Sequence, residues 1–130
     1  MKINDKNGKL IAIILNFNDA NDYKNFYTDN EADMQFGVFN LPKDEEIANH
    51  YHPSQQRIIN TTSEALILIE GKLEVSLYDD DLEHIKNVIL DGGSVLITVS
   101  GGHGIKTIEN TKLIEIKQGP YNEETDKVRF

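Results

Sequence analysis

The feature that most constrains the fold of this chain is a series of short β-rich segments in its second half. Turn-forming glycine, aspartate and asparagine residues separate most of them. The segments span residues 64–71, 72–78, 84–90, 94–99, 104–109 and 112–118. Strands that recur every 8–12 residues with turn residues between them are typical of β-sandwiches and β-barrels. The spacing therefore predicts an all-β protein built from antiparallel strands.

The first half of the chain gives weaker signals. Residues 3–7 and 9–17 flank an Asn-Gly pair, which predicts a hairpin. The polar stretch 18–33 is expected to be loop with one short helical turn. Strands are predicted at 34–41 and 46–52, with a proline-containing turn between them. A length of 130 residues suits one domain covering residues 1–130.

Charge and cysteine content exclude several classes of site and partner. The chain has 13 basic and 22 acidic residues and a formal charge of −9, so a nucleic-acid partner is not expected. It has no cysteine, which excludes disulfides and thiolate metal sites. The apolar run at 10–15 is too short to span a membrane. We therefore expect a soluble cytoplasmic protein with no membrane partner.

Three of the four histidines form a candidate metal site. His50 and His52 lie two residues apart, so on a strand their side chains would share a face and could converge on one ion. Taken alone, the pair could equally be two surface histidines. His103 follows two glycines that allow a sharp turn at the start of a strand. His84 lies in an acidic run and is expected to be exposed.

Glu64 is the candidate carboxylate ligand. On a strand over 64–70 it would share a face with Leu66 and Leu68, and the opposite face is also apolar, so the strand is predicted to be buried on both sides. A carboxylate there needs a partner, either a metal or a cation such as Arg57. A hairpin centred near residue 58 would pair His52 with Glu64.

These residues resemble the motifs of the cupin superfamily. His50 and His52 match the H-x-H of its first motif, and Glu64 with Gly71 matches the E-x6-G that ends that motif. His103 stands at the spacing from Gly92 that its second motif requires. The resemblance implies a cupin double-stranded β-helix, a jelly-roll barrel of antiparallel strands.

One departure leaves the fourth ligand open. Eleven residues separate His52 from Glu64, where the cupin pattern has three or four, and strict spacing places Gln56 at the glutamate position. The resemblance thus implies a metal held by His50, His52 and His103, with Glu64 or Gln56 as the fourth ligand. Ligands of these types suit Fe, Mn, Ni, Cu or Zn, and do not choose among them.

A pocket is expected at the mouth of the barrel. The alternation of side chains along the strands predicts that its lining includes Leu66, Leu68, Ile105 and Thr107. Arg57 is a candidate pocket residue that could hold an anionic or sugar ligand. Ordinary core or surface positions are the alternative for these five residues. No catalytic residue is assigned.

The end of the chain gives a functional context. Residues 115–130 resemble the tail of small, uncharacterised cupins associated with surface-polysaccharide biosynthesis. This implies a protein that binds or acts on a small metabolite, such as a sugar or nucleotide sugar. A ligand-binding cupin without catalysis and a metal-free sugar isomerase using the pocket histidines are the alternatives. The apolar strand at 11–15, taken as exposed, predicts a homodimer.

Overall fold

The computed structural model describes residues 1–130 and is built almost entirely from strands. Its single helical element is the 3-10 turn η1 (Phe17–Asp19), and no helix is long and apolar enough to cross a membrane. The strands are β1 (Lys2–Asn4), β2 (Leu10–Asn16), β3 (Lys24–Phe26), β4 (Gly37–Phe39), β5 (Glu64–Glu70), β6 (Lys72–Tyr78), β7 (His84–Asp91), β8 (Ser94–Thr98), β9 (Gly102–Thr107) and β10 (Lys112–Lys117).

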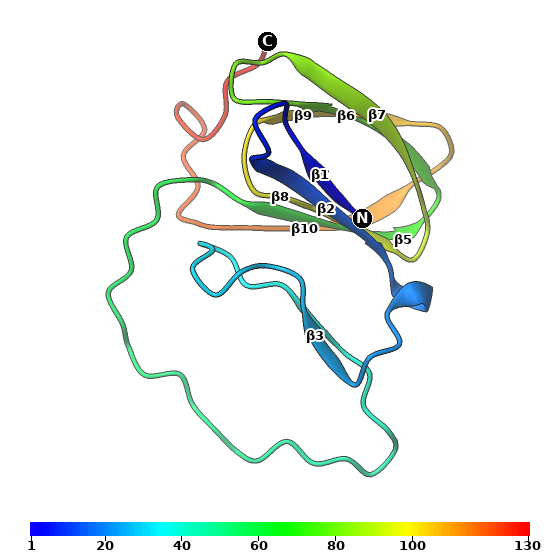
Figure 1. The fold of residues 1–130 in the computed structure, drawn as a ribbon, viewed down its shortest axis with the longest axis vertical. Coiled ribbons are helices and arrows are strands. Elements are labelled where there is room, and N and C mark those ends of the chain that lie inside the picture. Colours follow the sequence, from blue (N-terminus) through cyan, green and yellow to red (C-terminus); the bar gives the residue numbers. More distant parts are fainter.

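The strands form two main sheets that face each other, with a small hairpin beside them (Figure 1). The larger sheet has the order β1-β2-β8-β5-β10, the smaller one the order β7-β6-β9, and β3 pairs with β4. Every strand pair is antiparallel. The predicted all-β antiparallel class is therefore confirmed. Neither sheet closes on itself, so the architecture shown is an open sandwich and not a closed barrel.

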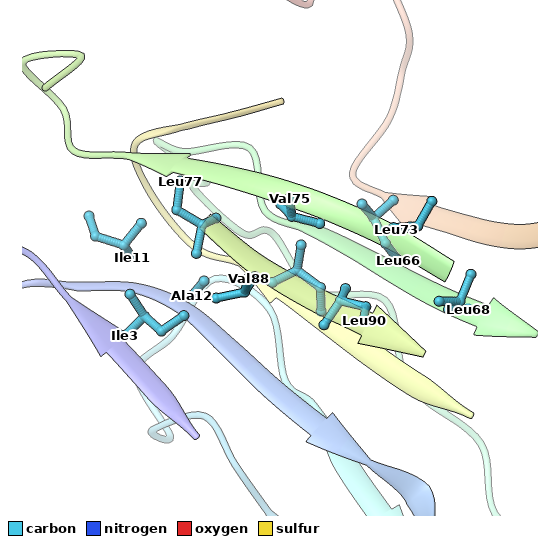
Figure 2. Packing of buried hydrophobic residues seen from close by; sticks show 11 residues of the cluster. Ile3, Ile11, Ala12, Leu66, Leu68, Leu73, Val75, Leu77, Val88 and Leu90 are labelled. Atoms are coloured by element: carbon cyan, nitrogen blue, oxygen red, sulfur yellow. The ribbon is translucent and has the colours of Figure 1, made fainter. Parts of the chain in front are cut away.

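The main core lies between the two sheets. In β6 the apolar residues alternate with polar ones, and Leu73, Val75 and Leu77 all point into the sandwich and are fully buried. They meet Leu66 and Leu68 of β5 in a cluster of 11 buried residues (Figure 2). Burying one such side chain contributes about 1.5–3 kcal/mol, so this alternation fixes which face of each sheet turns inward.

The outer face of the larger sheet carries a second apolar cluster. Its four buried residues are Ile13, Ala65, Val95 and Ile97. Side chains from the β3–β4 region, including Tyr27 and Phe36, pack against them. The prediction that 64–70 is buried on both sides is confirmed at Ala65, Leu66 and Leu68, and it fails at the exposed end of the strand, Ile69 and Glu70.

The predicted strand at 46–52 is wrong. Residues 40–63 contain no strand, and Figure 1 shows them as a wide arc beside the sheets. The strand predicted at 34–41 shortens to β4. The predicted pairing of His52 with Glu64 is also wrong, because β8 and β10 occupy both edges of β5 and place Thr98 and Lys117 opposite Glu64.

The observation used to predict a homodimer does not hold. Ile11, Ala12 and Ile13 are buried within the same chain, because β2 lies between β1 and β8 and both of its faces are covered. The homodimer remains a prediction, without the exposed strand on which it was based.

Candidate functional site

A row of polar residues crosses the inner face of the larger sheet at one end of the sandwich. Glu64 begins β5, with Lys117 of β10 directly opposite on one side and Thr98 of β8 on the other. Directly paired residues in a sheet project from the same face. Leu66, which shares the face of Glu64, belongs to the core between the sheets. The row therefore lies at the rim of the core, where the apolar filling ends.

His103 approaches this row from the opposite sheet. It lies on β9, an edge strand, and its register partner is Leu77, so its side chain also turns toward the space between the sheets. The His103 Nε2 atom lies 3.1 Å from Glu64 Oε2. The two side chains are only 25% and 18% exposed. The sandwich thus joins an imidazole and a carboxylate that are far apart in the sequence.

Lys117 connects Glu64 to the C-terminal segment, residues 118–130. Its Nζ atom forms an ion pair with the carboxylate of Asp126 and lies 3.9 Å from Glu64 Oε1 and 3.8 Å from Glu115 Oε1. The hydrogen bond to Asp126 is the main reason that the pKa of Lys117 is raised. Lys117 is therefore charged throughout the neutral range and neutralises part of the negative charge at this rim.

The pKa of Glu64 is lowered in the folded protein. The hydrogen bond with His103 is the largest cause, and the nearby charges of Lys117 and Lys127 act in the same direction. Partial burial opposes them, because desolvation disfavours the charged carboxylate. The net effect keeps Glu64 ionised, so it is available as a hydrogen-bond acceptor near neutral pH.

A cavity of about 700 Å³ opens beside the Glu64–His103 pair. Residues of both sheets line it, and residues 126–130 form a further wall. The ring of Phe130 packs edge-on against Tyr78, with centroids 5.0 Å apart, and also lies close to Gly102. The end of the chain therefore returns to the sandwich, reaching from the end of β10 toward β6 and β9 (Figure 1).

The Glu64–His103 pair can perform two kinds of chemistry. A carboxylate beside an imidazole nitrogen fixes the orientation and tautomer of the ring, as in many acid–base catalysts. The same pair offers a hydrogen-bond acceptor and a group that can donate or accept, which suits a ligand rich in hydroxyl groups. Both uses require only that the ligand enter the adjoining cavity.

The structure does not bring His50 and His52 to this pair. Both lie exposed on the segment between β4 and β5, with ring centroids 5.2 Å apart. His50 Nδ1 lies 3.0 Å from the carbonyl oxygen of Ala48, its sequence neighbour. Gln56 is exposed on the same segment. His84 is exposed, as expected, and its Nε2 lies 2.7 Å from Asn87 Oδ1.

The structure does not gather the predicted metal ligands at one point. Transition metals in proteins are commonly held by three or four protein ligands. The structure contains no group of three or more His, Cys, Asp or Glu side chains arranged to hold an ion. Glu64 and His103 supply two donors, and the other predicted donors lie on the exposed segment. The four-ligand site therefore stays a prediction.

The five predicted pocket residues have different positions. Ile105 lines the cavity. Thr107 pairs with Leu73 and shares the face of His103. It lies at the far end of β9, however, and is outside the cavity. Leu66 and Leu68 belong to the main core. Arg57 is exposed on the segment between β4 and β5 and borders a different surface hollow, near Lys117 and Gln118.

Sequence analysis missed the basic and acidic residues near the C-terminus. Lys117 could have been found from the register of β5 against β10, because it is the direct partner of Glu64. Asp126, Lys127 and Arg129 lie in a polar tail with no strand pattern. No local signal in the sequence places that tail at the site.

Comparison of the chain with protein families, with curated proteins and with solved structures gives no match.

Proposed function

We propose that this protein is a cupin that binds a small polar metabolite, of the sugar or nucleotide-sugar class, in the cavity beside Glu64 and His103. The contact between these two side chains, inward-facing and largely shielded from solvent at the cavity wall, is the observation that carries the proposal. The cupin assignment and the class of metabolite rest on the sequence motifs around His103 and on the tail. An antiparallel sandwich with its polar pair at one open end is compatible with both.

The composition of the cavity supports a sugar-like ligand. Binding sites for small molecules combine apolar walls with a few convergent polar groups. Here the lining includes the apolar residues Ile105 and Val128, while Glu64, His103 and Ser100 supply polar groups. A sugar presents both a hydroxyl-rich edge and an apolar ring face, so it can use both kinds of wall.

The test is to measure the binding of a panel of sugars and nucleotide sugars by thermal shift and by titration calorimetry. We expect at least one compound to stabilise the wild-type protein, and we expect His103→Ala and Glu64→Gln to weaken its binding about tenfold or more, the loss typical of a charge-assisted hydrogen bond. His84→Ala is the matched control, since His84 is an exposed histidine on β7 of the same sheet and lies outside the cavity. Equal binding by all four proteins would refute the site.

Metal binding is the second candidate function. Two observations favour it. Two of the four predicted ligands, Glu64 and His103, are already in contact, and the outer edge of β9 has no strand partner. An extended segment carrying His50 and His52 could pair with that edge. Residues 40–63 would have to leave the position that the structure shows.

Metal content of protein purified without a histidine tag tests this second candidate. About one equivalent of a transition metal in the wild type, lost in both His103→Ala and His50→Ala, would support a site that joins the two regions. Metal lost only in His103→Ala would assign the site to the rim alone. If the protein converts a bound sugar and this activity persists in the presence of a chelator, the result would favour proton transfer by His103 over metal chemistry.

A further inference from the structure

The C-terminal wall of the cavity carries two cations that form no direct ion pair with a carboxylate. Lys127 and Arg129 both line the cavity, on either side of Val128. Both are exposed, and neither forms an ion pair within the protein. Glu64 and His103 line the same cavity, so a ligand that contacts that pair would lie in the hollow that these cations border.

The carboxylates around the cavity are already occupied. Glu64 contacts His103, and Glu64, Glu115 and Asp126 all lie within 4 Å of the Lys117 ammonium group. Three carboxylates thus gather around one lysine and one histidine, while Lys127 and Arg129 have no carboxylate oxygen within 4 Å, although the charge of Lys127 acts on Glu64 from a greater distance. The carboxylates of the cavity lining are thus engaged with Lys117 and His103, which leaves Lys127 and Arg129 as its two cations without a direct ion pair.

Contacts on either side fix the stretch of backbone that carries the two cations. Asp126, which directly precedes Lys127, is tied to Lys117, and its side chain is only 11% exposed. Phe130, which directly follows Arg129, packs against Tyr78. A binding group that is already positioned loses less conformational entropy when its ligand arrives. The tail therefore presents Lys127 and Arg129 between two anchored residues.

We propose that Lys127 and Arg129 bind a phosphate or diphosphate group of the ligand, so that the C-terminal segment selects phosphorylated sugars or nucleotide sugars over free sugars. This inference rests on the proposed function, because it concerns the same cavity. Arginine suits the role because its guanidinium group can donate two parallel hydrogen bonds to phosphate oxygens. Cations beside the cavity also offset locally the repulsion that a chain with a formal charge of −9 exerts on an anion.

The experiment measures the affinity of three probes: glucose, glucose 1-phosphate and UDP-glucose. The variant is Lys127→Gln with Arg129→Gln. The matched control is Lys86→Gln with Lys112→Gln, which removes the same charge from two exposed strand positions outside the cavity.

We expect the wild type to bind at least one phosphorylated probe more tightly than glucose. The tail variant should lose that binding about tenfold or more, and the control less than twofold. Comparing glucose 1-phosphate with UDP-glucose shows whether one phosphate suffices or a nucleotide diphosphate is needed.

The outcomes separate this inference from the proposed function. Glucose bound as tightly as both phosphorylated probes, or a phosphorylated probe bound equally by tail variant and control, would overturn the role of the two cations and leave the metabolite site intact. No binding of either phosphorylated probe by the wild type would also overturn it. Failure of the proposed function is recognised separately, by probe binding that does not depend on Glu64 or His103.

Discussion

Two regions of this chain carry histidines that the sequence predicts as metal ligands, and the two regions end in different structural states. Between residues 64 and 117, every strand finds a partner, and His103 contacts a carboxylate at the rim of the core. Between residues 40 and 63, the chain forms no strand, and His50 and His52 contact mainly their own sequence neighbourhood. The difference teaches that a pair of histidines two residues apart defines a shared face only when a neighbouring strand holds the backbone extended.

The reason lies in how each region can bury apolar surface. Strand β6 places an apolar residue at every second position, so pairing it buries Leu73, Val75 and Leu77 together. Residues 46–52 offer Ile47 as their one aliphatic side chain larger than alanine, and Pro53 lacks the amide hydrogen that a ladder requires. Ordering that backbone would cost about 1–2 kcal/mol per residue with little burial to offset it.

Amide hydrogen exchange should show the largest contrast between the two regions. No backbone amide from residue 46 to 62 donates a hydrogen bond, whereas β6 is paired on both edges. We expect β6 amides to exchange only through global unfolding, which typically costs about 5–15 kcal/mol, and the 46–62 amides to exchange at nearly the free rate. Slow exchange at 50–52 would break the comparison, because it would show that this segment is paired in solution.

Truncation of one aliphatic residue in each region should give the next largest effect. Leu77→Ala removes a fully buried side chain and should lower the free energy of unfolding by about 2–5 kcal/mol. Ile58→Ala removes a side chain that is 80% exposed and should change it by less than about 0.5 kcal/mol. Chemical denaturation measures both. A cost above about 1 kcal/mol for Ile58→Ala would mean that the segment packs against something in solution.

The turn that leads into β9 should be more sensitive than a comparable turn elsewhere. Gly101 has a φ of 70°, and a Cβ there would overlap the carbonyl oxygen of Tyr78, whereas Gly93 has a φ of 85° with open space around it. We expect Gly101→Ala to cost about 3 kcal/mol, from strain and overlap together. Gly93→Ala should cost about 1 kcal/mol, from backbone strain alone. Equal losses in thermal denaturation would contradict the close approach of β6 that positions His103.

Replacement of Glu64 should have a small, pH-dependent effect. Because the folded-state pKa of Glu64 is lowered, its stabilisation is present above the ordinary value of 4.5 and is lost as the pH falls through the lowered value. Glu64→Gln should therefore cost about 1 kcal/mol at pH 7, a figure reduced by the remaining solvent exposure, and nothing in strong acid. His50→Ala, the control from the exposed segment, should change stability by less than about 0.5 kcal/mol at every pH. A pH-independent loss for Glu64→Gln would indicate lost packing instead of a lost charge interaction.

Much of the fold could be predicted from the sequence because it depends on local patterns. The six segments from 64 to 118 correspond to β5 through β10, with boundaries that differ by at most two residues. The N-terminal hairpin also forms, with the Asn-Gly pair in its turn. Alternation of side chains and turn chemistry act within a few residues, so they can be recognised without knowledge of the partners.

The site could be predicted only in part. Glu64 and His103 were identified as candidates, because each begins a strand next to turn residues or an apolar run. Their mutual contact depends on how the two sheets stack, and the roles of Lys117 and Asp126 depend on register and on the path of the tail. No spacing rule links residues so far apart in the chain.

The sequence by itself determined that this chain forms antiparallel strands and which residues of each strand turn inward, because burial of alternating apolar side chains is a local property. Only the tertiary structure decided which strands are neighbours, and with them the composition of the site. Both edges of β5 are taken by β8 and β10, which leaves residues 46–52 without a partner there. Competition among strands for a limited number of edges is a property of the whole molecule, and it keeps His52 away from Glu64. The stacking of the two sheets, which is equally a property of the whole molecule, brings His103 to Glu64 instead.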